Sequence, residues 1–153
     1  MKKLRIYADT SVFGGCFDEE FAEESKILFE EIRAGGFILV VSDVLLREIL
    51  DAPERVTRLV AELPPDFVEF IPASDEMEAL AGAYIQAGVV GPAAQRDAEH
   101  IAAASVADVD LIISWNFRHI VHYDKIRGYH AVNLLKGYKA IPIYSPREVV
   151  ERP

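Results

Sequence analysis

Three carboxylate side chains lie at the predicted ends, or on the core-facing side, of buried segments. Asp9 directly follows the apolar run LRIYA, Glu48 lies about one and a half turns into a helical segment after a second apolar run, and Asp97 begins the core face of an alanine-rich helix. A cluster of unpaired carboxylates repels itself and raises its own pKa values, so a divalent cation is its natural counter-charge. Oxygen ligands without His or Cys favour Mg2+ or Mn2+.

Each polar residue at these positions also has a purely structural interpretation. Asp9 caps a helix in that interpretation, and Asn116, which follows the apolar run LIIS and a tryptophan, caps a helix beginning at Phe117. Glu48 and Asp97 are then solvated helix charges. Spacing alone leaves both interpretations open.

Two other titratable residues, His100 and Asp110, are expected to take no part in the reaction. His100 shares a helix face with Asp97, but beside Ile101 and Ala104 it is predicted to be a packing residue with satisfied hydrogen bonds rather than a metal ligand. Asp110 opens an apolar strand, and the length of that strand places it roughly 13 Å from the end where the other polar residues gather.

The elements that must position these residues alternate between two kinds of segment. Short, mainly apolar runs predict buried strands at 4–8, 37–41, 67–71, 111–114 and 142–144. Amphipathic or capped segments predict helices at 19–34, 44–50, 54–62, 74–87 and 93–106. Apolar strands separated by helices indicate a three-layer α/β/α fold with a central parallel sheet of about five strands. Ligands of such sheets bind beyond the carboxyl ends of the strands, where Asp9, Glu48 and Asp97 are expected to converge.

Length and composition limit the possible classes. The chain has 153 residues, and without a long linker we expect residues 1–153 to form one domain. A single cysteine, Cys16, excludes an intrachain disulfide and a zinc site built from cysteines, which favours a cytoplasmic protein. No apolar run reaches the ~18 residues of a membrane span, so no membrane association is expected.

The charge is unevenly distributed along the chain. The net charge is −9, but residues 1–76 carry 17 acids and 8 bases, whereas residues 77–153 carry 8 of each. Between Arg118 and Arg147 there are six bases, three histidines and one acid, interleaved with aromatic residues. This basic stretch is a candidate for contacts with the phosphates and bases of a nucleic acid. Core aromatics beside an ordinary wetted surface would produce the same pattern.

Four segments together resemble a known family. YADTSVF, LLREIL, RDAEHIAAA and DLIISWNFRHI, in this order and at about these distances, are similar to the sequence motifs of PIN domains. The resemblance covers nearly the whole chain and is closest to the bacterial single-domain members grouped with VapC-type toxins. It implies a metal-dependent endoribonuclease that hydrolyses RNA phosphodiester bonds, the toxin of a type II toxin–antitoxin pair. It also implies a cognate antitoxin and a homodimer.

The resemblance assigns roles to individual acids. Asp9, Glu48 and Asp97 match the first three acidic positions of the family and would hold Mg2+ or Mn2+ for catalysis. The fourth catalytic position falls at Asn116, where many members have Asp. This substitution removes one charge, although an amide oxygen can still ligate a metal or orient a water.

Hydroxyl and basic residues near these acids are the expected substrate-binding groups. Thr10 and Ser11 match the hydroxyl positions beside the first acid, where they would hold a metal-bound water or the scissile phosphate. Helix capping is the alternative role for both residues. Arg118, the first base of the basic stretch, is the expected phosphate contact.

Two other classes of function are compatible with the sequence. In the first, the chain is a catalytically weak or inactive PIN-like module that acts through protein binding, with the helices of residues 42–63 as the surface for a partner. In the second, it is a phosphatase of the haloacid dehalogenase type, which also has an Asp after its first strand. The second Asp of that motif is missing, because Ser11 stands there.

Overall fold

The sheet has five parallel strands, as the sequence predicted. A computed structural model describes residues 2–150 and orders the strands β3-β2-β1-β4-β5. The strands are β1 (Leu4–Ala8), β2 (Phe37–Ser42), β3 (Val68–Ile71), β4 (Leu111–Ile113) and β5 (Ile143–Tyr144). All four pairings are parallel, with Ile6 opposite Leu39 on one side and opposite Leu111 on the other.

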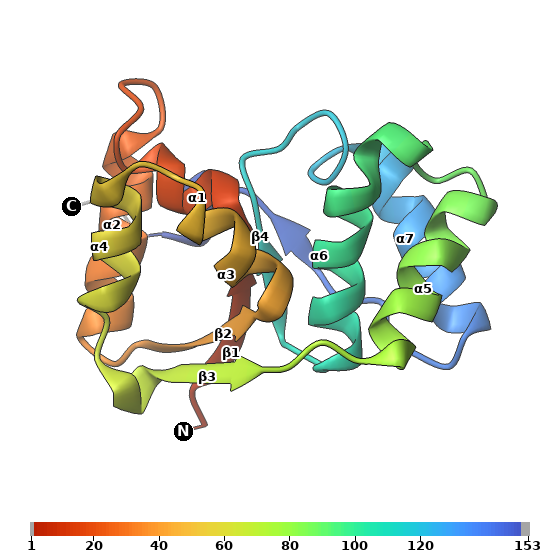
Figure 1. The fold of residues 1–153 in the computed structure, drawn as a ribbon, viewed down its shortest axis with the longest axis horizontal. Helices are drawn as coiled ribbons and strands as arrows, with labels where there is room; N and C mark the ends of the chain where they lie inside the picture. The colour runs from red at the N-terminus through yellow and green to blue at the C-terminus, as the bar shows by residue number, and fades with distance from the viewer. Residues whose placement is uncertain (1, 151–153) are drawn as a thin grey trace.

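The helices alternate with these strands along the chain (Figure 1). They are α1 (Thr10–Gly15), α2 (Ala22–Arg33), α3 (Asp43–Leu50), α4 (Glu54–Ala61), α5 (Asp75–Gln86), α6 (Gln95–Val106), α7 (Tyr123–Leu135) and α8 (Pro146–Val149). Two 3-10 turns, Pro65–Phe67 and Pro92–Ala94, precede β3 and α6. The helices predicted between the strands are present, and all but α3 are slightly shorter than predicted.

Helix α7 was not predicted from the sequence. It occupies much of the basic stretch, and its buried residues are Tyr129, Val132 and Asn133. A Cβ at Gly128 would lie 2.8 Å from the side chain of Val89, so the absence of a side chain there allows α7 to pack against the segment that follows α5.

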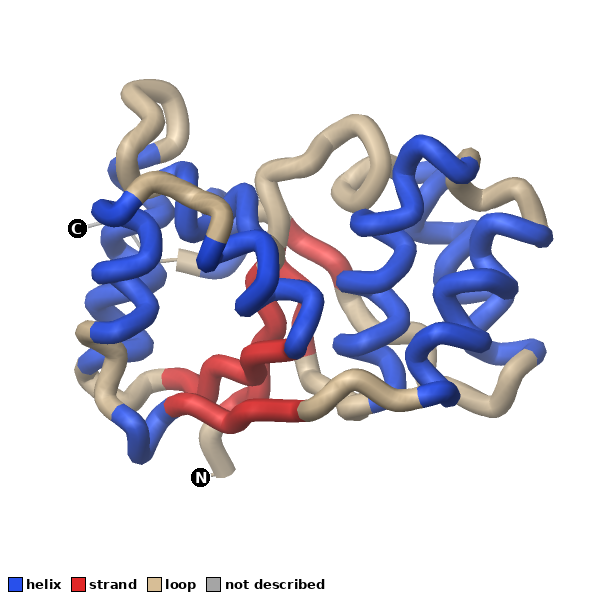
Figure 2. The backbone as a smooth tube through the Cα atoms, in the orientation of Figure 1, coloured by secondary structure: helices blue, strands red, loops and turns tan. Residues whose placement is uncertain are grey.

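Each face of the sheet is covered by its own apolar cluster, because alternate side chains of a strand point to opposite faces. Tyr7 belongs to the cluster under α5, α6 and α7, whereas its neighbours Ile6 and Ala8 belong to the cluster under α1, α2, α3 and α4. Figure 2 shows these two helical layers on either side of the strands. The chain therefore has the expected three-layer α/β/α architecture.

The order of the strands reverses at β1. From β1 the chain moves outward to β2 and β3, and it returns to the other side of β1 with β4 and β5. The two directions separate at the carboxyl ends of β1 and β4, where the backbone N–H of Asp9 donates to the carbonyl of Ile113 at 3.2 Å. Such reversals of strand order are where open α/β sheets bind ligands.

Within residues 2–150, no helix has the length and apolar character that crossing a membrane requires.

Candidate active site

Asp9 is a buried carboxylate at the carboxyl end of β1. Asp9 stands at the N-cap position of α1, as its structural interpretation predicted, but its side chain makes no capping hydrogen bond. Instead its Oδ1 accepts a hydrogen bond from the Ser11 hydroxyl at 2.6 Å, and Ser11 Oγ in turn accepts the backbone N–H of Trp115 at 2.9 Å. Ser11 thus fixes the carboxylate of Asp9 and joins β1 to the segment after β4.

Burial dominates the electrostatics of Asp9. Desolvation raises the pKa of Asp9, and the negative charge of Asp97 adds to this rise. His100 and the hydroxyls of Ser11 and Ser114 act in the opposite direction. Asp9 is therefore the carboxylate of the site whose negative charge is least compensated by the protein.

Glu48 is placed by the start of α3. Ser42, the last residue of β2, caps α3 by accepting the backbone N–H of Leu45 at 3.1 Å. About one and a half turns later, Glu48 Oε1 accepts the Thr10 hydroxyl at 2.8 Å and contacts His100 Nε2. Its other oxygen lies 3.8 Å from the guanidinium of Arg96.

The surroundings of Glu48 favour its ionised form. Partial burial raises the pKa of Glu48, whereas the hydrogen bond and the charge of His100 lower it. Thr10 and Arg96 act in the same direction, so the pKa of Glu48 lies below its ordinary value.

A series of buried hydrogen bonds connects Glu48 to the sheet. The Tyr7 hydroxyl lies 2.6 Å from His100 Nδ1 and 2.6 Å from Ser42 Oγ. Tyr7 is fully buried, and desolvation holds its pKa far above its ordinary value, so it stays protonated. This series of hydrogen bonds links the end of β2, the last residues of β1 before Asp9, and α6 to one carboxylate, since Tyr7 is the penultimate residue of β1.

Asp97 and Asn116 lie on the other side of the site. Asp97 Oδ2 lies 3.0 Å from His119 Nδ1. Asn116 Oδ1 accepts the backbone N–H groups of His119 at 2.9 Å and of Arg118 at 3.2 Å. Asn116 thus caps a segment as its structural interpretation predicted, but the segment is a turn over residues 117–120 rather than a helix.

Two histidines complete the site, and neither was assigned to it from the sequence. His100 is buried with satisfied hydrogen bonds, as expected, but one of its partners is Glu48. His119 belongs to the turn that Asn116 holds. The three-residue spacing between Asp97 and His100 was the available signal for His100, whereas His119 reaches Asp97 only through the turn.

Of the other candidate residues, some lie at the site and one lies away from it. Thr10 and Ser11 both contact acids of the site. Arg118 lies in the exposed turn beside Asn116. Asp110 accepts the backbone N–H of Arg5 at the opposite end of β1, away from the site as predicted.

The aromatic residues of the basic stretch fall into two groups. Trp115 is buried and stacks on Phe21 with ring centroids 4.3 Å apart, and Tyr129 is also buried. Phe117 and Tyr123 are exposed. The core interpretation is therefore right for the first pair, while the second pair remains accessible to a ligand.

The donor chemistry of the site fits a hard divalent cation, because its acids supply oxygen ligands and Asp9 and Asp97 repel each other. Among residues 2–150, however, no group of three or more His, Cys, Asp and Glu side chains is already arranged to hold a metal ion. Glu48 and Asp97 instead contact His100 and His119.

Comparison with known proteins informs the fold. No known family profile and no curated protein matches the sequence. Among solved structures, a chain of FitAB bound to an IR36 DNA fragment is similar, with a TM-score of 0.59 and 12% identity over 97% of this chain and 99% of that chain. Tyrosyl-tRNA synthetase from Aeropyrum pernix has a TM-score of 0.50 and 11% identity over 92% of this chain and 53% of that chain. At such identities the likeness concerns the fold alone, and the first match supports a PIN-like fold.

Proposed function

We propose that the protein is a metal-dependent endoribonuclease, the toxin of a toxin–antitoxin pair. The observation that carries this proposal is Asp9, a buried carboxylate with a raised pKa that interacts with Asp97 at the carboxyl edge of the sheet. A divalent cation is the group that would relieve this repulsion. Asp9 and Asp97 would hold Mg2+ or Mn2+, with Glu48 as the third acid.

The other side chains would prepare these acids for phosphodiester hydrolysis. A bound metal ion neutralises charge on the phosphate and lowers the pKa of a water. Ser11 would hold the carboxylate of Asp9, and Thr10 would hold that of Glu48, as both do by hydrogen bonds. Asn116 would support the turn that carries His119 and Arg118 rather than act as a fourth acid.

The RNA would approach along the turn after β4. Arg118 and the exposed rings of Phe117 and Tyr123 follow the site directly in the sequence and are available for phosphate contacts and base stacking. The matched FitAB chain belongs to a complex bound to DNA. This supports a search for a DNA-binding antitoxin as partner, alongside the proposed homodimer in the cytoplasm.

The substitution Asp97→Asn tests the nuclease. Purified protein with Mn2+ should cut a mixed pool of end-labelled structured and single-stranded RNAs, and EDTA should stop the cutting. The variant should lose roughly 100-fold or more of the rate, because charge stabilisation in such sites contributes effects of this order. Asp66→Asn, an exposed acid-to-amide change before β3, is the matched control and should cut like the wild type. Wild-type rates in folded Asp97→Asn protein would refute the assignment.

A protein-binding module without catalysis is the second candidate. It is favoured by the two acids that already contact histidines and by Asn116, which serves as a cap. Calorimetric titration with Mn2+ separates the two functions. The nuclease should bind the ion and lose that binding in Asp9→Asn, whereas the module need not bind it.

A further inference from the structure

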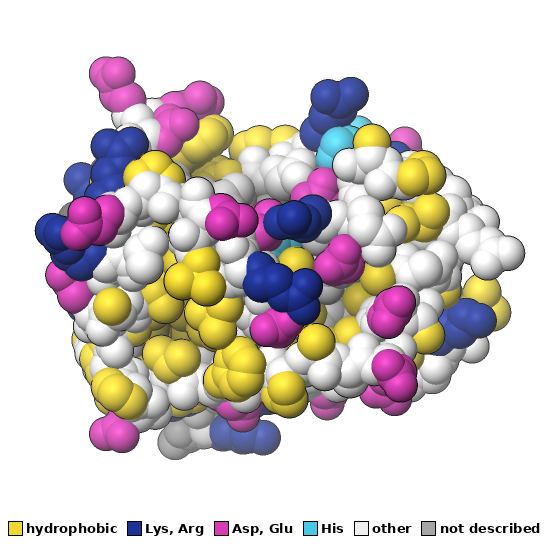
Figure 3. Space-filling model, viewed as in Figure 1, with side chains coloured by type: hydrophobic (Ala, Val, Ile, Leu, Met, Phe, Trp, Pro, Cys, Tyr) yellow, Lys and Arg dark blue, Asp and Glu magenta, His cyan; other side chains and the backbone are white. Residues whose placement is uncertain are grey.

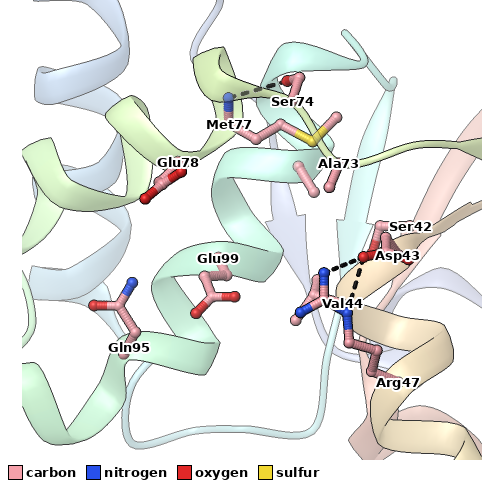
Figure 4. Close-up of a pocket in the computed structure, with 11 residues that line it drawn as sticks. Ser42, Asp43, Val44, Arg47, Ala73, Ser74, Met77, Glu78, Gln95 and Glu99 are labelled. Carbon is pink, nitrogen blue, oxygen red and sulfur yellow. Dashed lines mark hydrogen bonds and ion pairs between the residues drawn. The ribbon is translucent and has the colours of Figure 1, made fainter.

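A cavity of about 270 Å3 lies between α3, α5 and α6, beside the candidate active site (Figure 4). It is at the carboxyl ends of β2 and β3, because Ser42 ends β2 and Ala73 follows β3. None of the roles assigned above uses this cavity.

The cavity and the site share two helices. Arg47 lines the cavity and the next residue, Glu48, belongs to the site. On α6, Gln95 and Glu99 line the cavity, and the residues that follow each of them, Arg96 and His100, contact Glu48. A polymeric ligand that passes Glu48 on its way to the site would therefore place its next residue at this cavity.

Arginine side chains lie between the two places. Arg96 pairs with Glu48 at 3.8 Å, and Arg47 pairs with Asp43 on α3. Both arginines are largely exposed, and Figure 3 shows Lys or Arg side chains among acids in the middle of this face. A phosphate crossing from the site to the cavity would have cations within reach.

The residues that line the cavity are suited to a ligand other than a phosphate. Glu78 and Glu99 offer carboxylate acceptors, Gln95 offers an amide, and Met77 provides an apolar wall. In Figure 4, Glu99 points from α6 into the space that faces Arg47. A ligand that fits must be compact and partly apolar and must bring N–H donors to the carboxylates.

We propose that this cavity binds the base of the nucleotide next to the cleaved phosphate, with preference for a base whose edge presents adjacent N–H donors, as guanine does. The proposal rests on RNA being the substrate, as argued above. Proteins read unpaired RNA bases by hydrogen bonds to their Watson–Crick edges, and a carboxylate accepts two adjacent N–H groups at once. The arginines at the rim would hold the backbone while the cavity reads the base.

Binding without metal tests the cavity separately from the nuclease. The full chain in EDTA is titrated with labelled hexauridylate and with hexamers in which one central uridine is replaced by guanosine, cytidine or adenosine. The guanosine hexamer should bind on the order of tenfold more tightly than hexauridylate. Glu99→Gln and, independently, Glu78→Gln should reduce this preference to about twofold or less, because glutamine replaces one of the two acceptor oxygens with an NH2 donor, which faces an N–H group of the base instead of accepting it.

Glu19→Gln is the matched control, since Glu19 is exposed and lies in the segment before α2, away from the lining of the cavity. It should retain the full preference, and thermal unfolding should show that all variants are folded. Equal binding of the four hexamers, no binding up to millimolar protein, or a preference kept in both cavity variants would overturn the proposal. The proposal would also be overturned if the four hexamers bound equally and a blocked Gly-Arg-Gly peptide displaced them from the wild type but not from Glu99→Gln. That result would assign the cavity to a basic protein segment. Base preference without any metal-dependent cutting would refute the nuclease and leave the cavity proposal standing.

Discussion

Asp9 and Glu48 lie in the same site but in opposite electrostatic settings. Asp9 is buried at the end of β1, where hydroxyls are its hydrogen-bond partners, and burial raises its pKa. Glu48 is partly exposed on α3, where His100, Thr10 and Arg96 surround it and its pKa is lowered. The fold therefore stabilises the charge of one acid and opposes that of the other.

The difference indicates which acid depends on a cation. A protein that supplies donors and a neighbouring histidine to Glu48 has already compensated its charge, so that side chain contributes to the stability of the fold. His100 and two hydroxyls compensate the charge of Asp9 only in part, because desolvation outweighs them, so this charge is costly until a cation binds. Sites that store such a cost for function are commonly less stable than their neutral variants.

Removal of the charge at Glu48 should have the largest effect on stability. Glu48→Gln should lower the free energy of unfolding by about 1–2 kcal/mol, because hydrogen bonds to charged groups contribute about 1.5–3 kcal/mol and neutral ones about 1. Urea unfolding at neutral pH in EDTA measures this value. The exposed change Glu19→Gln should shift it by about 0.5 kcal/mol or less. An unchanged stability in Glu48→Gln would contradict the account of its surroundings.

The matching change at Asp9 should act with the opposite sign. Asp9→Asn removes a desolvated charge while its Oδ1 keeps the hydrogen bond from Ser11, so the free energy of unfolding should rise by about 0.5–2 kcal/mol in EDTA. Mn2+ should stabilise the wild type against thermal unfolding and should not stabilise this variant. A less stable Asp9→Asn protein would mean that the charge of Asp9 is compensated after all.

The two acids should also be separable by pH. A raised pKa means that the folded state binds more protons, so the contribution of Asp9 to stability falls as the pH rises through its folded pKa. A lowered pKa means that the contribution of Glu48 is present above its unfolded pKa and is lost as the pH falls through its folded pKa. When the pH falls from about 8 to about 3, the difference in the free energy of unfolding between Asp9→Asn and the wild type should shrink. The difference between the wild type and Glu48→Gln should also shrink, but only at the lowest pH. Differences that do not vary with pH would refute both assignments.

The sequence was sufficient for the fold and for part of the site. Strands 4–8 and 111–114 are mainly apolar, which indicates a parallel sheet; Asp9 follows the first directly, and Asn116 follows the second after one tryptophan. Helix α7 was missed because Lys125, Arg127 and His130 interrupt its apolar residues, and Tyr129 is buried by tertiary contacts that no local pattern records.

The contacts of the histidines were beyond local sequence patterns for a similar reason. His100 and Glu48 are 52 residues apart, and they meet only because α3 and α6 both begin at the carboxyl edge of the sheet. His119 depends on the turn that Asn116 caps. The pattern located the acids, but the packing of separate elements determined which partners compensate them.

The smallest effect is expected from the exposed cation beside Glu48. Arg96 lies 3.8 Å from Glu48 with 64% of its side chain exposed, and such pairs contribute about 0–1 kcal/mol. Arg96→Gln should therefore lower the free energy of unfolding by less than Glu48→Gln does, and added salt should reduce the difference further. Urea unfolding at low and high salt measures both effects. An effect of Arg96→Gln as large as that of Glu48→Gln would show that surface charge, rather than the buried contact with His100, holds Glu48 ionised.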